Sequence, residues 1–421
     1  MNDELSAIQG PIAYLTGEYP KVSHTFILRE VEGLRAQGLD VTTCSIRKPS
    51  ASDFRGEEEL RARAETFYVI EAARNPLRLL SAHLRLFARA PGRWLSTLGL
   101  AWRTRAPGLK AWLWQLFYFL EAGVLAEHLR AKGVRHLHNH FANSSCSVAM
   151  MTSALSDIGF SFTEHGPSTF FEPRLWALDE KIARARFVVA ISHFCRSQLM
   201  FFSDPAHWSK IAIVHCGVTP AAYGRSRRAT SGKRAIFVGR LAPVKGAPLL
   251  VETFARVLRT HPDAHLTVVG EGPSRADAEA RVQALGIGHA VTFTGFRAQG
   301  EVAALLEDSD MLLLPSFAEG VPVVLMEAMA SRIPVVASRV AGVQELVEDG
   351  VTGFAVPPGD IDSLAARIGQ LMTDPEAAAA MGVTGRAVVE RDFDIAREAA
   401  WLATLFRQGG GHGRLRPDAA A

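Results

Sequence analysis

Short apolar runs alternate with amphipathic stretches along most of the chain, and glycine, proline or polar residues separate them. Apolar runs bounded by turn residues are typical of buried strands, whereas apolar stripes at intervals of three and four are typical of helices. The pattern predicts strands at 12–15, 41–46, 134–138, 160–163, 187–191, 211–215, 235–238, 265–269, 291–293, 311–314 and 334–337. Strands that alternate with helices indicate parallel, doubly wound α/β sheets.

The strand–helix pattern restarts after a polar, basic stretch, YGRSRRATSGKR, which is typical of a linker. A length of 421 residues also favours two domains. The predicted parts are a first domain at 1–222 with a basic, aromatic helical insertion at about 71–130, a linker at 223–234, a second domain at 235–394, a C-terminal helix at 395–408 that crosses back, and a disordered tail at 409–421.

Composition restricts the class of protein. Hydrophobic residues at 48% and charged residues at 21% describe a globular chain with ample core, and a net charge of +3 is too small to indicate nucleic acid. The polar start, MNDELSAIQG, predicts no signal peptide, and the longest apolar stretch, 111–126, is shorter than the roughly 20 residues of a membrane span. Four scattered cysteines without a C-x-x-C motif predict reduced thiols in a cytoplasmic protein: Cys44, Cys146, Cys195 and Cys216.

One stretch departs from this even composition. Between Glu71 and Lys110, seven arginines and the lysine are interleaved with leucines and tryptophans, and Glu71 is the only acid. The aromatic run WLWQLFYF follows at 112–119. A basic amphipathic helix with aromatic residues favours an anionic membrane surface. One alternative is an insertion whose arginines are solvated and whose aromatic residues pack on the sheet. Nucleic acid is a weaker alternative, because no recognised nucleic-acid-binding module is visible.

The loops after the strands of the second half collect cations. The carboxyl ends of parallel strands meet at one edge of a sheet, so these loops are expected to lie together. Arg240 and Lys245 follow one strand and can bind phosphate, and Phe296 and Arg297 follow another, where they could flank a nucleobase. The intervening turn Gly270–Pro273 and the segment GRLAPVKG match neither a dinucleotide fingerprint nor a Walker loop.

The segment from Met311 to Ser331 predicts a strand, a loop with Glu319, and a helix that starts at Pro322 and contains Glu327. Free N–H groups at a helix N-terminus suit a phosphate, while carboxylates suit the hydroxyl groups of a sugar or a ribose. A sugar nucleotide satisfies both requirements. The alternative is an ordinary strand–helix step with two solvated glutamates.

Histidines mark the strand ends of the first half. Three of them, at 136, 138 and 140, are close in sequence, but no further ligand follows at metal spacing, so no metal site is predicted. His165 and Gly166 follow the next strand, where a glycine allows the backbone to approach a ligand. Ser23 is expected to cap the first helix.

Together these motifs resemble the GT-B retaining glycosyltransferases of family 4. In the second half the resemblance rests on Gly239-Arg240-Leu241 with Lys245-Gly246, on the Gly270–Pro273 turn, and on Glu319 and Glu327 at the E-x7-E spacing. The first half resembles the exopolysaccharide, colanic-acid-type branch through Tyr19-Pro20, Ser23, Thr25–Ile27, Glu30, His138–Ala142, Ser161–His165 and His215–Val218. It departs from the family at Thr16-Gly17-Glu18, where a glycine-rich turn is usual, and at Gly166.

The resemblance implies two Rossmann-like domains that face a central cleft, and a metal-independent, retaining transfer without a cofactor. Arg240 and Lys245 would neutralise the leaving diphosphate, Glu319 would bind the donor sugar, and His165 would reach that sugar from the first domain. Further substrate contacts are expected at Gly17, Ser23, His140, Gly166, Glu271, Phe296, Arg297, Gly320, Val321, Pro322, Val323 and Glu327, the last of them at the ribose.

The implied partners are a UDP- or GDP-linked sugar, a saccharide or lipid-linked saccharide acceptor, and the inner face of a membrane, with no nucleic acid. The predicted protein is therefore cytoplasmic and peripheral on that membrane. Two other functions fit the same motifs: a GT-B sugar-nucleotide epimerase, and a non-catalytic sugar-nucleotide sensor or scaffold. A phosphorylase is disfavoured because no lysine motif for pyridoxal phosphate is present.

Overall fold

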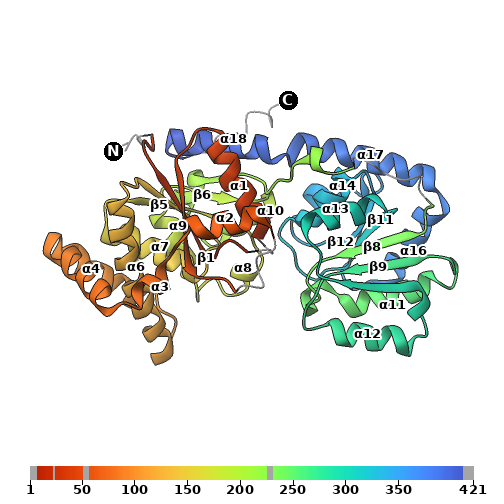
Figure 1. The fold of residues 1–421 in the computed structure, drawn as a ribbon, viewed down its shortest axis with the longest axis horizontal. Coiled ribbons are helices and arrows are strands. Elements are labelled where there is room, and N and C mark those ends of the chain that lie inside the picture. The colour runs from red at the N-terminus through yellow and green to blue at the C-terminus, as the bar shows by residue number, and fades with distance from the viewer. Residues whose placement is uncertain (1–6, 22–23, 51–55, 225–230, 411–421) are drawn as a thin grey trace. The chain divides into compact units, whose positions relative to one another are not determined.

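Strands and helices alternate along the computed structural model, which describes residues 7–21, 24–50, 56–224 and 231–410 (Figure 1). The predicted cap Ser23, the middle of the predicted linker and most of the predicted tail lie outside these residues. The chain forms two units, Met1–His215 with Arg397–Ala421, and Cys216–Ala396. Each unit is described by itself below.

Unit 1 is built on a seven-stranded parallel sheet in the order β3-β2-β1-β4-β5-β6-β7. Its strands are β1 Ile12–Glu18, β2 Val41–Arg47, β3 Phe67–Tyr68, β4 His136–His140, β5 Gly159–Glu164, β6 Val188–Ala190 and β7 Ile211–Ile213. Ile12 of β1 pairs with Val41 of β2 on one side and with His136 of β4 on the other. Strand β1 therefore lies in the middle of the sheet.

Helices complete unit 1 and bury its sheet. They are α1 Thr25–Ala36, α2 Glu57–Glu65, α3 Val69–Ala73, α4 Pro76–Arg89, α5 Pro91–Arg103, α6 Leu109–Ala131, α7 Ser144–Leu155, α8 Ser168–Phe171, α9 Leu178–Arg184, α10 His193–Phe201 and α18 Ile395–Gln408. Helix α18 belongs to this unit from Arg397 onward, and its Leu402 and Phe406 are buried in one core cluster with Ile12 and Phe187.

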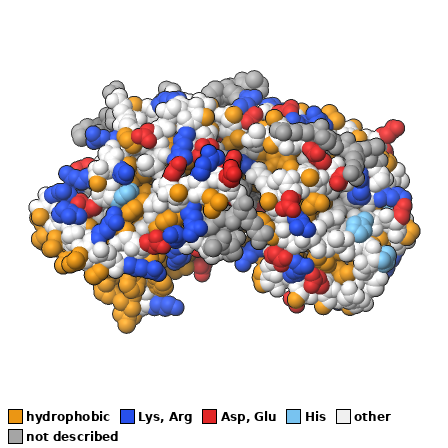
Figure 2. Space-filling model, in the orientation of Figure 1, with side chains coloured by type: hydrophobic (Ala, Val, Ile, Leu, Met, Phe, Trp, Pro, Cys, Tyr) orange, Lys and Arg blue, Asp and Glu red, His pale blue; other side chains and the backbone are white. Residues whose placement is uncertain are grey.

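The basic, aromatic stretch forms several helices rather than one long amphipathic helix, because Pro76 and Pro91 each begin a new helix, as proline does at a first turn. The helices α4, α5 and α6 pack on one another through buried residues such as Leu86, Leu100 and Phe119. Their outer faces still expose many large apolar side chains, which gather over this part of the unit in Figure 2.

Unit 2 has a six-stranded parallel sheet in the order β10-β9-β8-β11-β12-β13. The strands are β8 Arg234–Val238, β9 His265–Val269, β10 Val291–Gly295, β11 Met311–Leu314, β12 Val335–Ser338 and β13 Gly353–Val356. The helices are α11 Ala247–Val257, α12 Arg275–Ala284, α13 Gln299–Glu307, α14 Val323–Ala330, α15 Val343–Leu346, α16 Ile361–Thr373 and α17 Pro375–Asp392.

The predicted fold class, two doubly wound parallel α/β sheets, is confirmed. All predicted strands are present. The edge strands β3 and β13 were not predicted, and β1 and β4 extend further toward the C-terminus than predicted. Strand β4 runs to His140 because its polar side chains are buried and bonded within the unit. Among the described residues, no helix is both long and apolar enough to span a membrane.

Candidate functional site

The strand order of unit 2 creates a crevice at one position. From β8 the chain proceeds to β9 and β10 on one side, and then returns to place β11 on the other side of β8. The loops that follow β8 and β11 therefore diverge at the carboxyl ends of neighbouring strands. Open α/β sheets bind ligands at such a switch point. Arg240 and Lys245 follow β8, and Glu319 follows β11, so all three lie on the loops at this crevice.

Two glycines allow these loops to pack closely. Gly246 has a φ of 68°, and a Cβ atom there would overlap the carbonyl oxygen of Pro315 in the loop after β11. Gly270 has a φ of 136°, and a Cβ atom there would overlap the carbonyl oxygen of Gly239 in the loop after β8. Only glycine satisfies both the positive φ and the backbone contact. These loops are therefore held by backbone packing.

Backbone hydrogen bonds join the same loops. The N–H of Leu241 donates to the carbonyl of Glu271 at 2.9 Å, which links the loops after β8 and β9. The N–H of Phe317 donates to the carbonyl of Val244 at 2.8 Å, which links the loops after β11 and β8. The edge of the sheet is thus a connected surface on which side chains keep fixed positions.

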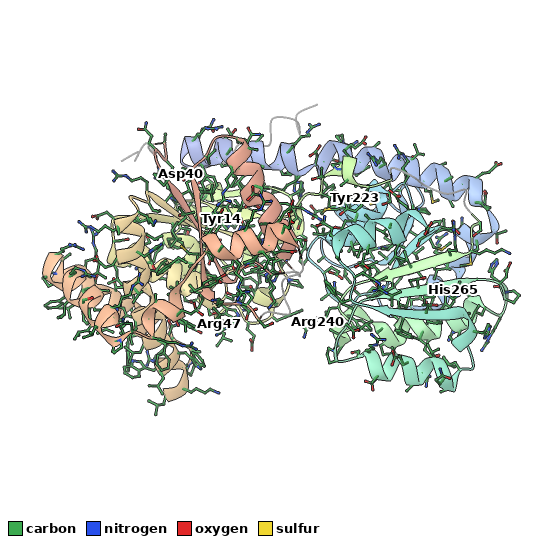
Figure 3. All side chains as sticks on the ribbon, viewed as in Figure 1. Tyr14, Asp40, Arg47, Tyr223, Arg240 and His265 are labelled. Atoms are coloured by element: carbon green, nitrogen blue, oxygen red, sulfur yellow. The ribbon has the colours of Figure 1, made fainter. Side chains whose placement is uncertain are left out.

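A cation and a carboxylate meet at this edge. Lys245 Nζ donates to Glu319 Oε1 at 2.6 Å, and the Glu319 side chain is only 9% exposed. Arg240, on the same loop, is exposed (Figure 3). Pro322 precedes the first residue of α14, whose N-terminal N–H groups lack partners from an earlier turn of the helix. The edge therefore offers two cations, amide donors and one carboxylate, as a sugar diphosphate requires.

The remaining predicted residues of unit 2 lie on neighbouring loops and elements. Glu327 is nearly buried in α14, where its Oε1 accepts a hydrogen bond from the Tyr223 hydroxyl at 2.8 Å. Glu271 forms an ion pair with Arg275, four residues later, so its side chain is held near the start of α12. Arg297 lies 3.8 Å from Glu301 on the exposed surface of α13. Phe296, beside Arg297, is half-buried.

Unit 1 has its own switch point, between β1 and β4. Buried histidines and a glutamate lie at this point. His140, the last residue of β4, is fully buried. Its Nδ1 lies 2.8 Å from Nε2 of His165. On the other side of the His140 ring, Nε2 lies 3.2 Å from Oε1 of Glu30, a residue of α1. Burial and the neighbouring His140 lower the pKa of His165 well below its usual value, so that this imidazole is neutral.

A buried carboxylate shapes the loop that contains His165. Glu164 accepts hydrogen bonds from the N–H groups of Ala142 at 2.7 Å and Gly166 at 2.9 Å, and thereby ties the ends of β4 and β5 together. Burial raises the pKa of Glu164, and these donors act in the opposite direction. Lys181 Nζ donates to the carbonyl of Ala142 at 2.8 Å, and burial lowers the pKa of this lysine to about 8.

The histidines of β4 form a hydrogen-bonded ladder. His138 bonds through Nδ1 to Ser161 at 2.7 Å and through Nε2 to Thr163 at 2.9 Å. Side-chain atoms of Glu30, His138 and His140 lie within 4.8 Å of one another, as in some metal sites. Both ring nitrogens of His138 are already bonded, however, and burial lowers the pKa of His138 well below its usual value.

The structure distributes the predicted residues over both units. Gly17, His140, His165 and Gly166 lie in unit 1, with Gly17 inside β1 rather than in a loop after it. The other described candidates lie in unit 2: Arg240, Lys245, Glu271, Phe296, Arg297, Glu319, Gly320, Val321, Pro322, Val323 and Glu327.

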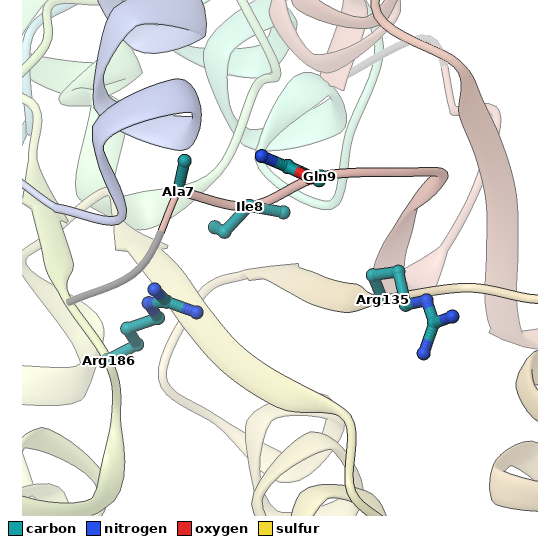
Figure 4. Close-up of a pocket in the computed structure, with 5 residues that line it drawn as sticks. All are labelled: Ala7, Ile8, Gln9, Arg135 and Arg186. Carbon is teal, nitrogen blue, oxygen red and sulfur yellow. The ribbon is translucent and has the colours of Figure 1, made fainter.

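A pocket of about 360 Å³ lies elsewhere in unit 1 (Figure 4). Arg135 and Arg186 line it with the segment 7–9, and they precede β4 and β6, so the pocket is at the amino ends of the strands. It is therefore on the opposite edge of the unit 1 sheet from the switch point between β1 and β4.

Four buried residues that contact predicted residues or their loops were not among the predicted candidates: Glu30, Tyr14, Glu164 and Tyr223. For Glu30 a signal existed. Helix α1 buries Ile27, Val31 and Leu34, and position 30 falls on the same face, so a carboxylate there is directed inward. A charged residue within an apolar stripe indicates a buried partner.

Comparisons with known proteins match two consecutive parts of the chain to two family models. Residues 224–388 match the family model described as glycosyl transferases group 1, and residues 23–222 match the model described as glycosyltransferase family 4. The amylovoran biosynthesis glycosyltransferase AmsK from Erwinia amylovora is 31% identical over 231 residues, which are 53% of this chain and 54% of that protein. The chain spans about half the length of the curated relatives it matches.

Solved structures share the architecture over nearly the whole chain. A sucrose-phosphate synthase from Thermosynechococcus elongatus matches with a TM-score of 0.71 and 22% identity, covering 95% of this chain and 99% of that one. HepE from Anabaena, in complex with UDP and glucose, matches with a TM-score of 0.71 and 18% identity, covering 94% and 99%. At these identities the likeness shows a common fold.

Proposed function

We propose that this chain, a GT-B glycosyltransferase of the group 1 and family 4 type, moves a sugar from a nucleotide diphosphate to a saccharide. The main support is the edge of the unit 2 sheet, where Arg240, Lys245 and Glu319 follow the two strands of the switch point. Cations beside amide donors suit a diphosphate, and a nearly buried carboxylate suits sugar hydroxyl groups.

In this proposal the reaction is driven by stabilising the leaving group. The bond between the anomeric carbon and the diphosphate oxygen breaks, and the acceptor oxygen bonds to the same face of that carbon. The proton of the acceptor hydroxyl passes to the departing phosphate. Arg240, Lys245 and the N-terminal amides of α14 neutralise the developing negative charge, without a metal ion. Glu319 then orients the sugar, and Glu327 binds the ribose.

The Lys245–Glu319 ion pair has a place in this mechanism. A paired lysine and glutamate cancel each other before the donor arrives, which avoids leaving a nearly buried carboxylate without a partner. The donor would then divide the pair, with its phosphate on the lysine and its sugar hydroxyls on the glutamate. The pair therefore keeps both side chains in position in the ligand-free protein.

The donor and acceptor classes are also part of the proposal. A UDP- or GDP-linked sugar is the proposed donor, which the complex of HepE with UDP and glucose supports by fold. A saccharide, and specifically a lipid-linked saccharide of a cell-surface polysaccharide, is the proposed acceptor, which the name of AmsK supports. Incubation with labelled UDP- and GDP-sugars and lipid-linked oligosaccharides tests both, with the product resolved by mass.

Each outcome of that incubation separates one function from another. Label in an extended saccharide, with the anomeric configuration of the donor, supports the proposal. A free sugar nucleotide with one inverted carbon would instead indicate an epimerase. Nucleotide-sugar binding without turnover on any acceptor would indicate a sensor or scaffold.

We further propose that the outer faces of α4, α5 and α6 bind the cytoplasmic face of an anionic membrane, where a lipid-linked acceptor is presented. Ten of the 21 exposed large apolar side chains of the described chain lie on these helices. On α4 they recur at intervals of three and four, so they share one face. The ten are Leu77, Leu80, Leu84, Phe87, Leu95, Trp102, Leu109, Leu113, Trp114 and Phe117.

The charge of this membrane-binding surface suits anionic headgroups. Residues 72–120 contain seven arginines and one lysine but no acid. Arg85 and Arg89 form ion pairs with Glu127, a single carboxylate from the far part of α6. Arg78, Arg103 and Lys110 form no ion pair with the described acids. Each such cation near an anionic surface contributes about 1 kcal/mol.

Vesicle flotation tests the membrane-binding surface. Protein is mixed with vesicles of phosphatidylglycerol and phosphatidylcholine in equal parts, or of phosphatidylcholine alone. Wild-type protein should float with the anionic vesicles only, and the triple variants Leu80→Gln/Leu84→Gln/Phe87→Gln and Arg78→Gln/Arg103→Gln/Lys110→Gln should remain at the bottom. The matched control Leu285→Gln/Val351→Gln/Val383→Gln changes exposed apolar residues of unit 2 and should float. Equal flotation by all variants would contradict the proposal.

A further inference from the structure

A chain of buried polar side chains connects α1 to the loop that contains His165. The Tyr14 hydroxyl donates to Glu30 Oε1 at 2.7 Å, and the same oxygen lies 3.2 Å from His140 Nε2. His140 Nδ1 lies 2.8 Å from His165 Nε2. All four residues are buried, and Tyr14 and His140 belong to β1 and β4, which form the switch point of unit 1.

The positions of the protons on these four side chains can be assigned, starting from Tyr14. Burial and Glu30 raise the pKa of Tyr14 well above 10, so its hydroxyl keeps its proton and donates to Glu30. The contact from His140 Nε2 to Glu30 departs from a linear hydrogen bond, and this nitrogen has no other partner among the described residues. A lone pair on Nε2 would face a carboxylate lone pair, whereas an N–H there places a partial positive charge against the carboxylate.

The tautomer of His165 follows from that of His140. The rings of His138 and His165 flank the ring of His140, with centroids 5.3 and 5.1 Å from its centroid. A neutral His140 with its proton on Nε2 has a lone pair on Nδ1. The hydrogen bond of 2.8 Å to His165 then requires a proton on the Nε2 of His165.

We propose that Glu30 is a positioning residue that acts through His140: it fixes the proton of His140 on Nε2, and His140 in turn fixes that of His165 on Nε2. His165 is thereby a hydrogen-bond acceptor at Nδ1 and not a donor. A change of tautomer in an imidazole reverses which partner it can bind. This assignment is independent of the reaction, and only its effect on turnover rests on the proposed function.

Nitrogen NMR of the whole protein, labelled with 15N only at histidine, tests the assignment without any substrate. The signals of the two residues are identified by their loss in His140→Asn and His165→Asn. In the wild type, each ring should show a protonated Nε2 and an unprotonated Nδ1 at neutral pH. A protonated Nδ1 on either ring, or an imidazolium at His140, would overturn the proposal.

Two variants separate positioning from a merely structural role. Glu30→Gln removes the carboxylate while keeping the shape, and it should give His140 and His165 a mixture of tautomers. Tyr14→Phe removes the other partner of Glu30 and should leave both tautomers unchanged. If Glu30→Gln kept the wild-type spectrum, Glu30 would not set the protons, and the proposal would fail. Should Glu30→Gln not fold, the wild-type spectrum decides alone.

Turnover provides a second readout that depends on the proposed function. With an active donor and acceptor, Glu30→Gln should lower kcat by about tenfold, which is less than the roughly 100- to 10,000-fold that a proton-transferring side chain contributes. Glu30→Asp retains a carboxylate and should recover part of the loss, whereas Tyr14→Phe should be close to wild type. Unchanged kcat with mixed tautomers would separate the two claims: the tautomer assignment would stand, and His165 would have no part in the reaction.

Discussion

The two switch points have the same topology and opposite chemistry. In unit 2, the loops after β8 and β11 present Arg240, Lys245 and a nearly buried Glu319. In unit 1, the corresponding ends of β1 and β4 lead to His140, one of a set of buried imidazoles joined to a glutamate. The parallel sheet therefore determines where a ligand can bind, and the residues on the loops determine which group is bound there.

The two edges also differ in how they are held. Backbone contacts through Gly246 and Gly270 fix the loops of unit 2, so their side chains remain available for a ligand. Side-chain hydrogen bonds fix the loops of unit 1, where Glu164 joins Ala142 to Gly166. Charge can therefore be placed at the unit 2 edge without disturbing its scaffold, while unit 1 depends on neutral histidines for its own stability.

The largest expected effect comes from the backbone packing of unit 2. Gly270→Ala places a Cβ atom against the carbonyl of Gly239 at a φ of 136°, so it should destabilise the fold by about 3 kcal/mol or more. Urea unfolding followed by circular dichroism measures this. Gly300→Ala, in α13 with open space around it, should leave stability unchanged or raise it. Equal stability of both variants would show that the loops are not packed as described.

A change at the cation should remove activity and spare the fold. Lys245→Ala takes away a charge that stabilises the leaving diphosphate, so kcat should fall by about 100- to 1,000-fold. Transfer of labelled sugar measures the loss. The protein should still fold, with a lower unfolding midpoint because the nearly buried Glu319 loses its partner. Lys233→Ala, an exposed lysine paired with Asp263, is the matched control and should keep full activity. Wild-type turnover in Lys245→Ala would contradict the site assignment.

Acid should weaken unit 1 through its buried histidines. Burial lowers the pKa of His136 from 6.5 to about 3. At pH values between these two, the unfolded chain binds a proton at His136 and the folded chain does not. The stabilisation is complete above pH 6.5 and is lost as the pH falls towards 3. From pH 6.5 to pH 5, His136 alone should cost about 2 kcal/mol.

Tryptophan fluorescence isolates this effect, because all seven tryptophans belong to unit 1: Trp94, Trp102, Trp112, Trp114, Trp176, Trp208 and Trp401. Urea unfolding followed by fluorescence at pH 7 and pH 5 should show the loss of stability, and His136→Gln should reduce it. His193→Gln changes an exposed histidine of the same unit and should retain the wild-type dependence. A dependence that is the same in wild type and His136→Gln would refute the explanation.

The smallest effect is expected at the exposed end of the unit 2 edge. Arg297 pairs with Glu301 only at 3.8 Å in solvent, so Arg297→Gln should change the free energy of unfolding by less than about 0.5 kcal/mol. If Arg297 flanks the nucleobase, the same variant should weaken nucleotide binding severalfold, as calorimetry would measure. Arg259→Gln changes an exposed arginine in the turn that follows α11, and it should change neither quantity. Unaltered affinity in Arg297→Gln would remove this residue from the site.

Much of the fold could be predicted because apolar runs and turn residues are local signals. The strand at Met311–Leu314 and the helix from Val323 followed directly from the pattern. The strand order did not, because it depends on packing between segments far apart in the chain. His140 was placed beyond the end of its strand because polar residues usually leave a sheet, and the partners that keep it inside, Glu30 and His165, are distant in sequence.

The positions of the candidate residues could be predicted in part for the same reason. Arg240, Lys245 and Glu319 each follow an apolar run in the sequence, and residues that follow parallel strands lie at the same edge of a sheet. The bond between Lys245 and Glu319 was not predictable, because it requires β8 and β11 to be neighbours. Tyr223 was read as the start of a linker, yet its hydroxyl reaches Glu327 across 104 residues of sequence.

The most direct test of the central claim is a crystal structure of the protein with bound UDP or GDP. The account predicts that the diphosphate lies at the carboxyl ends of β8 and β11, with its oxygens on Arg240 and Lys245 and its ribose on Glu327. A nucleotide bound elsewhere, or one whose phosphates touch neither cation, would contradict it.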